Sequence, residues 1–230
     1  MKALLFLLVA CPLASLAQDC KNFFYLTNNA QVQMTMYDKK GKENSTNTWQ
    51  INNVKKIPGG YESTINTSLK DEKGKEIANG TGTYKCENGI LKADARMSMP
   101  QQQAAGNSTE AKVESGYIEY PGNMSVGQSL NDVNFTMDVT SKNGMSSTVT
   151  FKENNRKVGA KESVTTPAGT WDAYVIGYDA VFRTQIAGIG IPVSFSAKEW
   201  FVPGFGVVKS ETYNKGGKLM GSSQITSIKK

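Results

Sequence analysis

Short runs in which apolar and polar residues alternate fill most of the chain, and they predict β-strands. A period of two places every second side chain on the same face of a sheet. These runs are rich in Thr, Val, Ile and Tyr, which are typical of strands. The clearest are residues 31–37, 61–69, 90–97 and 148–151.

Turns that place Asn or Asp close to Gly separate these runs. Asn and Gly tolerate the positive φ that tight hairpins require. Successive hairpins form an antiparallel meander, which closes or curls to protect its edges. The sequence therefore predicts an all-β fold, a strongly curved antiparallel sheet or barrel-like meander of about a dozen strands with one short helix. The turns are residues 38–42, 71–75, 87–89, 143–144 and 214–218.

The stretch from residue 156 to residue 213 is expected to organise this sheet. Two β-rich runs meet at Pro167 and Gly169, where Pro presets φ and Gly permits the turn. The second run carries apolar side chains on both faces, which is typical of a central strand. A similar turn is expected at Pro203 and Gly204.

One segment interrupts the β pattern. Residues 100–105 begin with Pro and continue with Gln and Ala, which favours one or two helical turns. The halves on either side, residues 19–99 and 117–230, are not bordered by a linker. We therefore predict a single all-β domain over residues 18–230.

The first 17 residues have the layout of a secretory signal. Lys2 precedes an apolar run at residues 3–9, and small residues end at Ala17. The apolar run is too short to span a bilayer, and no later segment is apolar enough to do so. We predict a signal peptide over residues 1–17 and a periplasmic or secreted protein. The alternative is a lipoprotein anchored at Cys11, because residues 8–11 also fit the pattern before a lipidated cysteine.

Cleavage after Ala17 would leave two cysteines, Cys20 and Cys86. An even number of thiols in an oxidising compartment favours a disulfide. The two residues lack the spacing of a redox pair or a zinc site. We therefore predict a structural bridge between Cys20 and Cys86.

Composition restricts the chemistry of the protein. The chain contains no histidine, which excludes Ser-His-Asp and Cys-His catalysis and every His-ligated metal site. No acidic loop has calcium spacing, and the acids lie mostly beside turns. Residues 188–193 lack the third glycine of a nucleotide loop and are better interpreted as a relaxed strand or bend. We predict no catalytic residues, no metal and no cofactor.

The formal charge of +6 has two interpretations. A basic protein can bind nucleic acid or an anionic membrane surface. Here the lysines are spread through turns and strand faces, and the aromatic residues are not interleaved with a basic stripe. The charge therefore indicates solubility, and we predict no nucleic-acid partner and no transmembrane segment in the mature chain.

The richest aromatic region of the sequence yields a candidate binding site. Alternation places one set of side chains on one face of a strand and a second set on one face of a later run. Serines among large residues leave room that a packed core would fill. If both faces look inward, they bound a pocket for an apolar ligand. The candidate residues are Trp171, Ala173, Val175, Ser194, Ser196 and Trp200.

Several motifs resemble the TapB-like family of secreted bacterial domains of unknown function. The resemblance covers nearly the whole mature chain, although residues after Pro100 are richer in Gln and Ala than the helix of relatives. It implies an all-β, envelope-associated protein with no established catalytic residues. The motifs are residues 85–89, 120–121, 126–130, 161–171, 203–213 and 217–221.

Two functions from different classes remain. The first is a non-catalytic secreted or periplasmic β-protein whose curved sheet binds an apolar or lipid-like ligand. The alternative is an envelope-associated protein–protein interaction module without a small-molecule ligand. An internal cavity lined by aromatic residues would favour the first, and a sealed core with an exposed apolar patch would favour the second. An enzyme ranks third.

Overall fold

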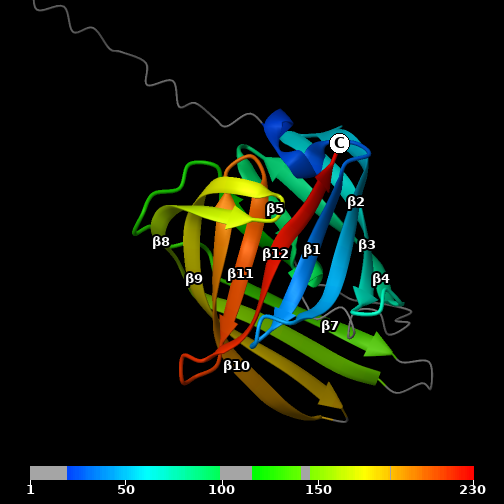
Figure 1. The fold of residues 1–230 in the computed structure, drawn as a ribbon, viewed down its shortest axis with the longest axis vertical. Helices are drawn as coiled ribbons and strands as arrows, with labels where there is room; N and C mark the ends of the chain where they lie inside the picture. Colours follow the sequence, from blue (N-terminus) through cyan, green and yellow to red (C-terminus); the bar gives the residue numbers. More distant parts are fainter. Residues whose placement is uncertain (1–19, 99–115, 141–145, 187) are drawn as a thin grey trace, which may run out of the picture.

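Twelve antiparallel strands form one sheet in a computed structural model of the protein (Figure 1). The structure describes residues 20–98, 116–140, 146–186 and 188–230. The predicted signal peptide, the predicted helix at residues 100–105 and the predicted turn at residues 143–144 lie outside the described residues. The strands are β1 (Gln31–Asp38), β2 (Glu43–Ile57), β3 (Gly60–Asp71), β4 (Glu76–Glu87), β5 (Ile90–Asp94), β6 (Tyr117–Pro121), β7 (Val133–Thr140), β8 (Ser146–Thr166), β9 (Gly169–Ile186), β10 (Ile189–Val202), β11 (Gly206–Tyr213) and β12 (Leu219–Lys229).

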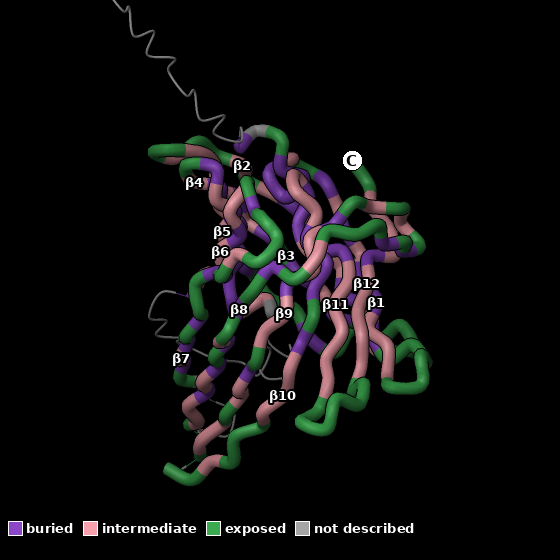
Figure 2. The backbone as a smooth tube through the Cα atoms, turned by 90° about the vertical axis from the view of Figure 1, so that its left-hand side faces the viewer, coloured by how far each residue is buried: buried purple, intermediate pink, exposed green. Residues whose placement is uncertain are grey.

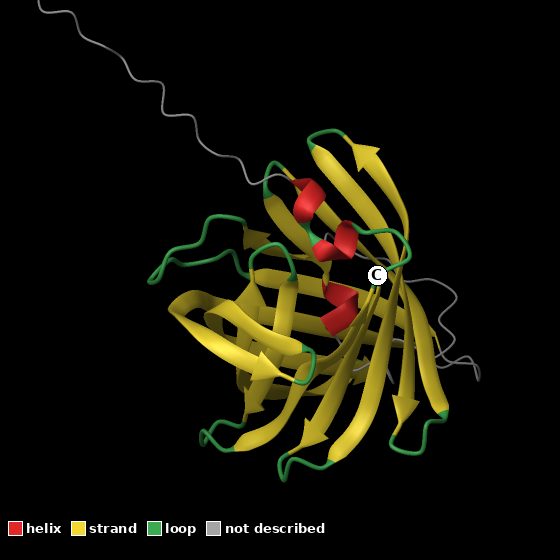
Figure 3. Cartoon of the chain, turned by 45° about the horizontal axis from the view of Figure 1, so that its top comes forward, coloured by secondary structure: helices red, strands yellow, loops and turns green. Residues whose placement is uncertain are grey.

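The sheet consists of two six-stranded meanders joined by one pair of strands. Its order is β6-β5-β4-β3-β2-β1-β12-β11-β10-β9-β8-β7, so β1 and β12 pair at its centre. Consecutive strands pair with each other throughout, except for β6 and β7, which form the two edges of the sheet. The sheet curls into a nearly closed barrel, as Figure 3 shows. The prediction of an all-β, strongly curved meander is confirmed.

Three of the predicted turns share one hydrogen-bonding pattern. Asp38 Oδ1 accepts hydrogen bonds from the backbone N–H groups of Lys40 and Lys42, at 2.8 and 2.9 Å. Asp71 and Asn214 accept the corresponding bonds in the β3–β4 and β11–β12 turns. Side-chain acceptors of this kind fix a turn locally, which is why short sequence motifs predict them well.

The N-terminal segment closes one end of the sheet. It forms two short helical segments, η1 (Cys20–Asn22) and η2 (Phe24–Leu26), drawn in blue near the C-terminus in Figure 1. Tyr25 is fully buried and stacks on Tyr84 of β4 with 4.4 Å between ring centroids. Cys20 forms a disulfide with Cys86 of the same strand. The predicted disulfide is confirmed, and it ties this segment to the sheet.

The two edge strands of the sheet, β6 and β7, do not pair with each other, and we call the place between these edges the seam. The connection at residues 122–132 lies in the seam. The backbone N–H of Leu130 donates to Arg156 O of β8 at 2.8 Å, and Gly127 donates to Val158 O at 2.8 Å. These bonds occupy backbone groups that β8 does not use in its pairing with β7. The connection thus holds the end of β6 against β8 and limits the opening of the barrel.

The long β8–β9 hairpin extends past the strand that pairs with β9. Pairing between β9 and β10 ends at Tyr174 and Phe201, whereas β8 and β9 remain paired up to the turn at Gly169. In Figure 1 this yellow part of the hairpin arches in front of β11. Its Trp171 ring packs against Phe205 at 4.9 Å between centroids. A third helical segment, η3 (Ala95–Ser98), follows β5.

Burial follows the alternation along the strands. On β10, Ala197, Glu199 and Phe201 are buried on the inner face, and Lys198 on the outer face is exposed. Trp200 is the exception, because it is buried although it lies on the outer face. Buried positions gather inside the curved sheet and exposed positions at the hairpin ends (Figure 2). The buried side chains, among them Tyr25, Ile65 and Phe201, pack together in one hydrophobic core.

Candidate functional site

A solvent-accessible crevice lies on the outward face of β8, β9 and β10. Its volume is about 520 Å³, within the range of small-ligand sites of roughly 300–1,000 Å³. Its lining is formed by Lys157, Gly159, Ala160, Glu162, Val175, Gly177, Lys198 and Trp200.

Trp200 is the largest side chain of the crevice, and two neighbours hold its ring in place. Its indole N–H donates to Glu162 Oε1 at 2.7 Å. The ammonium of Lys209 lies over the ring, 4.4 Å from the centroid. Trp200 is only 7% exposed and belongs to the buried hydrophobic cluster, although it alternates with the inward-facing Glu199 and Phe201. The ring is thus a preorganised apolar surface, since binding would not have to fix its rotamer.

Small residues create the space beside this ring. Val175 pairs directly with Trp200, and Gly177 pairs with Lys198 two residues along. A Cβ built at Gly177 would meet only Ala197 O, at 4.0 Å, and one at Gly159 only Val175 O, at 3.6 Å. Both are ordinary contacts, so the two glycines leave room that larger residues could occupy.

The charges at the crevice are mainly positive. Lys157 and Lys198 are exposed side chains on its lining. Glu162 is the acid on that lining, and it accepts the hydrogen bond from Trp200. The ammonium of Lys198 also lies over the Tyr213 ring, 5.9 Å from its centroid. An apolar wall with two ammonium groups at its border suits a molecule with an apolar body and an acidic group.

The six residues proposed from the sequence fall into three places. Val175 and Trp200 meet as a cross-strand pair in the crevice. Trp171 packs against Phe205, and Ala173 is fully buried. Ser194 and Ser196 share the outward face with Trp200 but pair with Val181 and Asp179, farther along β9. The structure therefore joins two of the six and places them on the outward face, not inside the barrel.

A second cluster of functional groups is buried inside the sheet beside the seam. Arg156 Nε lies 3.1 Å from Glu153 Oε2, and Arg156 Nη2 lies 3.7 Å from Glu199 Oε1. Arg156 Nη1 donates to the backbone carbonyls of Glu119 and Asn131, at 3.3 and 3.0 Å. One guanidinium thus connects two carboxylates with β6 and with the connection that precedes β7.

Burial and like charge alter the ionisation of this cluster. Burial, followed by the neighbouring Glu199 carboxylate, raises the pKa of Glu153 to about 8, although Arg156 opposes the shift. Burial likewise raises the pKa of Glu199, again against the effect of Arg156. Tyr120 and Tyr178 pack here too, and burial raises the pKa of both hydroxyls. Two carboxylates around one guanidinium favour a shared proton near neutral pH.

This cluster is a structural latch, because solvent cannot reach it. The side chains of Arg156, Glu153 and Glu199 are 0%, 2% and 8% exposed. Tyr120 stacks on Phe201 at 4.6 Å and covers the guanidinium, whose carbon lies 5.2 Å from the ring centroid. The cluster contacts backbone on both sides of the seam, so it stabilises closure of the barrel.

The latch predicts a pH dependence of stability. Because the folded-state pKa of Glu153 lies above its ordinary value of 4.5, the folded protein retains a proton that the unfolded chain releases. This contribution to stability is fully present below about pH 4.5 and is lost as the pH rises to about 8. Glu153→Gln removes this ionisation, so urea midpoints of the variant should fall less between those pH values. Equal pH dependence in the two proteins would contradict the assignment.

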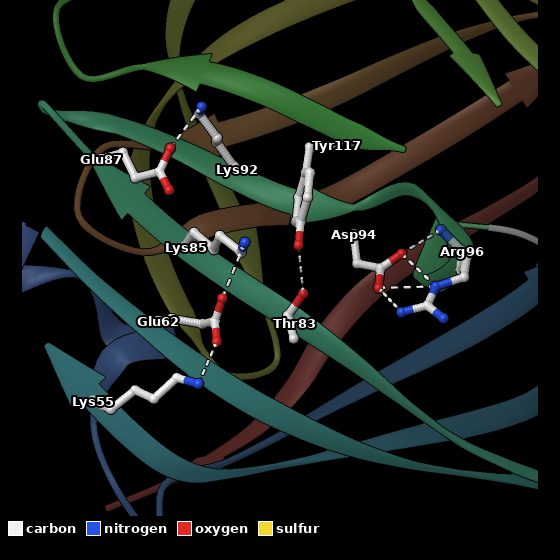
Figure 4. A network of polar contacts seen from close by, with 9 residues as sticks. All are labelled: Lys55, Glu62, Thr83, Lys85, Glu87, Lys92, Asp94, Arg96 and Tyr117. Carbon is white, nitrogen blue, oxygen red and sulfur yellow. Dashed lines mark hydrogen bonds and ion pairs between the residues drawn. The ribbon is translucent and has the colours of Figure 1, made fainter. Parts of the chain in front are cut away.

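The outer face of the first half carries a row of ion pairs (Figure 4). Glu62 lies between Lys55 and Lys85, at 3.0 and 3.1 Å. Lys92 contacts Glu87 at 2.8 Å. Each of these carboxylates has a cationic partner on its own or a neighbouring strand, so the row supports strand pairing and offers no free acid–base pair.

The described residues contain no group of three or more His, Cys, Asp or Glu side chains that could hold a metal ion. Within the same part of the chain, no helix is long and apolar enough to cross a membrane.

Sequence reasoning missed the latch, although the sequence holds a signal for it. Glu199 falls in register with Ala197 and Phe201, and Glu153 in register with Phe151. A carboxylate at a position that alternation assigns to the core requires a buried partner. Lys157, Lys198 and Glu162 were missed because solvated surface is the ordinary interpretation of such residues.

The fold and the outward crevice define an all-β protein built from one curved antiparallel meander. The chain belongs to the DUF3108-like family, whose model matches residues 27–225. The comparisons do not confirm the resemblance to the TapB-like family. A search of curated proteins finds no match.

Two solved structures share this fold. One is a candidate exported protein with a YmcC-like fold from Bacteroides fragilis, with a TM-score of 0.73 and 21% identity over 89% of this chain and 97% of that chain. The other is a candidate lipoprotein from Parabacteroides distasonis, with a TM-score of 0.72 and 22% identity over 92% of this chain and 100% of that chain. At this level of identity the likeness shows the fold alone.

Proposed function

We propose that the protein is a non-catalytic exported protein that binds an apolar or lipid-like ligand in the crevice beside Trp200. The observation that carries the proposal is the preorganised ring of Trp200 beside an unfilled volume of about 520 Å³. Ligand sites are concave and mostly apolar, with a few placed polar groups. The crevice has this composition, whereas the latch is inaccessible.

The ligand class follows from the lining. Gly159, Ala160, Val175 and Gly177 offer no hydrogen-bonding side chain, so they fit an acyl chain or another flat apolar body. Lys157 and Lys198 at the border fit an acidic group on the same molecule. A long-chain fatty acid is the simplest compound with both features.

An exported location is part of the proposal. It is supported by the signal-like pattern at residues 1–17 and by the disulfide between Cys20 and Cys86. The two structural relatives are described as an exported protein and a lipoprotein. Anchoring at Cys11 stays the alternative to soluble export. The TapB-like resemblance stays a proposal for a finer family assignment.

Calorimetric titration of the mature protein with a long-chain fatty acid tests the site. We expect saturable binding, and we expect Trp200→Ala to weaken it by about 1–3 kcal/mol, the scale of a lost buried aromatic contact. Gly177→Val should weaken binding as well, because it fills the crevice without a backbone clash. The methyl ester of the same acid should bind less tightly than the acid, since it lacks the charge.

Trp171→Phe is the matched control, because Trp171 was a candidate from the sequence but lies outside the crevice. It should bind like the wild type. Absence of saturable binding for fatty acids, phospholipids and isoprenoids, with folded protein confirmed by circular dichroism, would overturn the proposal. The alternative function is a docking module for another envelope protein without a small-molecule ligand. The filled interior of the sheet and the exposed aliphatic residues of the β9–β10 hairpin support this alternative, and it would then lead.

A further inference from the structure

Four aliphatic side chains are exposed together at the end of the β9–β10 hairpin. Ile189 and Ile191 are 80% and 82% exposed, and Val193 and Ile186 are 50% and 47% exposed. Ile186 pairs directly with Ile189 across the hairpin. Isolated exposed aliphatic residues are ordinary on a protein surface, but a contiguous group marks a contact site. We call these four residues the aliphatic tip.

The aliphatic tip occupies one face of the hairpin. Ile189, Ile191 and Val193 alternate with Gly190, Pro192 and Ser194, so they point to the same side. That side is buried farther along the strand, at Ala197 and Glu199. The apolar row of β10 therefore runs out of the core and continues into solvent.

The β9–β10 hairpin projects beyond the neighbouring strand β11. The pairing of β10 with β11 begins at Ser196, so residues 189–195 of β10 have no partner on that side. Seven residues of strand span about 23 Å. Figure 1 shows the hairpin at the lower end of the molecule, opposite the end that the N-terminal segment closes.

Residues 180–197 and 212–220, at this end of β9 to β12, contain no acidic residue. The adjoining β1–β2 turn, where Asp38 pairs with Gly221, carries Asp38 and Glu43 together with three lysines. Arg183 is the sole charged residue between Asp179 and Lys198. The β11–β12 turn lies at the same end and carries Lys215 and Lys218, both exposed. It is followed by Leu219 and Met220, which are 37% and 47% exposed. No acidic residue follows Glu211 in the chain.

We propose that the aliphatic tip and the β11–β12 turn form a site that binds the surface of an anionic lipid bilayer. Aliphatic side chains would enter the interfacial region while the lysines contact acidic headgroups, the combination by which peripheral proteins bind membranes. A second copy of the chain fits less well. The four side chains offer on the order of 400 Å² per copy, about half of what a stable interface buries on each partner.

The membrane site does not depend on the crevice. Trp200 and Gly177 lie on the outward face near the top of β9 and β10, whereas the tip lies at the other end of the same strands. Failure of ligand binding in the crevice would leave this proposal untouched, and the reverse also holds.

Co-sedimentation of the mature protein with lipid vesicles tests the site. We expect binding to vesicles that contain phosphatidylglycerol, weakening as salt is added, and much weaker binding to pure phosphatidylcholine. Ile189→Ser with Ile191→Ser should lower the partition coefficient at least about tenfold. Lys215→Gln with Lys218→Gln should lower it about fivefold for each lysine, on anionic vesicles only.

Val126→Ser is the matched control, because Val126 is 60% exposed but lies away from the tip. Its neighbour Gly127 bonds to Val158, which pairs with Ile176, ten residues along β9 from Ile186. It should bind like the wild type. A direct readout uses Ile189→Cys and Val126→Cys labelled with an environment-sensitive dye, since the native thiols are joined in the disulfide. The emission should shift to the blue with vesicles for the first and stay unchanged for the second.

Two results would overturn the proposal. The first is equal vesicle binding by the wild type and by the doubly substituted Ile189→Ser, Ile191→Ser protein, with both folded by circular dichroism. The second is an absence of binding of the folded wild-type protein to anionic vesicles. If light scattering then shows dimers that the same double substitution abolishes, the tip is an interface between copies of the chain.

Discussion

Arg156→Met is expected to lower the free energy of unfolding by about 3–5 kcal/mol, the usual effect of breaking a buried ion pair. The substitution removes the cation that lies between Glu153 and Glu199. It also removes the donor to the carbonyls of Glu119 and Asn131 at the seam. Methionine fits the volume of the lost side chain, so the loss reflects charge and hydrogen bonding more than a cavity. Urea denaturation followed by circular dichroism measures it.

Lys157→Met is the matched control, because the neighbouring residue is exposed and points to the other face. Its effect should stay within about 0.5 kcal/mol, as for most surface substitutions. The effect of Arg156→Met should shrink at acidic pH, where the two carboxylates take up protons and no longer require a cation. Equal denaturation midpoints for the two variants would show that the latch does not hold the seam.

Replacing all three charged residues of the latch separates the contribution of the buried charges from that of the hydrogen bonds of Arg156 to the seam. In a protein with Glu153→Gln, Arg156→Met and Glu199→Gln, no buried charge remains without a partner. Replacing a buried ionic group as a unit is often close to neutral, in contrast to removing one partner. The triple variant should therefore regain a large part of the stability that Arg156→Met loses. A further loss would show that the hydrogen bonds of Arg156 to the seam dominate.

Hydrogen bonds within short turn motifs explain why the turns and the strands between them could be predicted from the sequence. The turns at Asp38, Asp71 and Asn214 depend on a side chain that bonds to backbone groups two and four residues later. Such contacts lie within one short motif, so the motif predicts them. Strand alternation between these turns then determines which face of each strand is buried.

The latch escaped prediction because it depends on an irregularity in β8. Glu153 and Arg156 are three residues apart, which places them on opposite faces of a regular strand. The register of β8 shifts between Asn154 and Lys157, and Asn155 adopts a positive φ of 58°. This extra residue returns Arg156 to the buried face. No alternating pattern reveals where a strand gains such a residue.

The crevice escaped prediction for a related reason. Alternation predicted that Trp171, Ala173 and Val175 share one face of β9. A second register shift, between Val158 and Ala160, accompanies the arch of the hairpin. Past this bend Ala173 is buried and Trp171 meets Phe205, while Val175 remains beside Trp200. Which side chains border a shared space depends on the bend and cannot be obtained from periodicity.

Loss of the disulfide is expected to have an effect as large as that of Arg156→Met. Cys20 and Cys86 are 66 residues apart in sequence, and closing a loop of this length is worth about 4 kcal/mol in the chain-entropy model. The bridge also holds the segment that buries Phe23 and Tyr25 at the closed end of the sheet. A protein with Cys20→Ser and Cys86→Ser should therefore unfold at a markedly lower urea concentration.

Reduction of the wild-type protein is the control for the double serine variant. Dithiothreitol should lower the midpoint of the mature wild-type protein to that of the double serine variant and leave the variant unchanged. Thiol labelling of denatured, unreduced protein that is isolated from its own host and lacks residues 1–17 should give no signal, because both thiols are in the bridge. Two labelled cysteines per chain would show that the bridge does not form in the host. The disulfide would then not stabilise the protein in its host. A chain without the cross-link keeps the full entropy of its unfolded state.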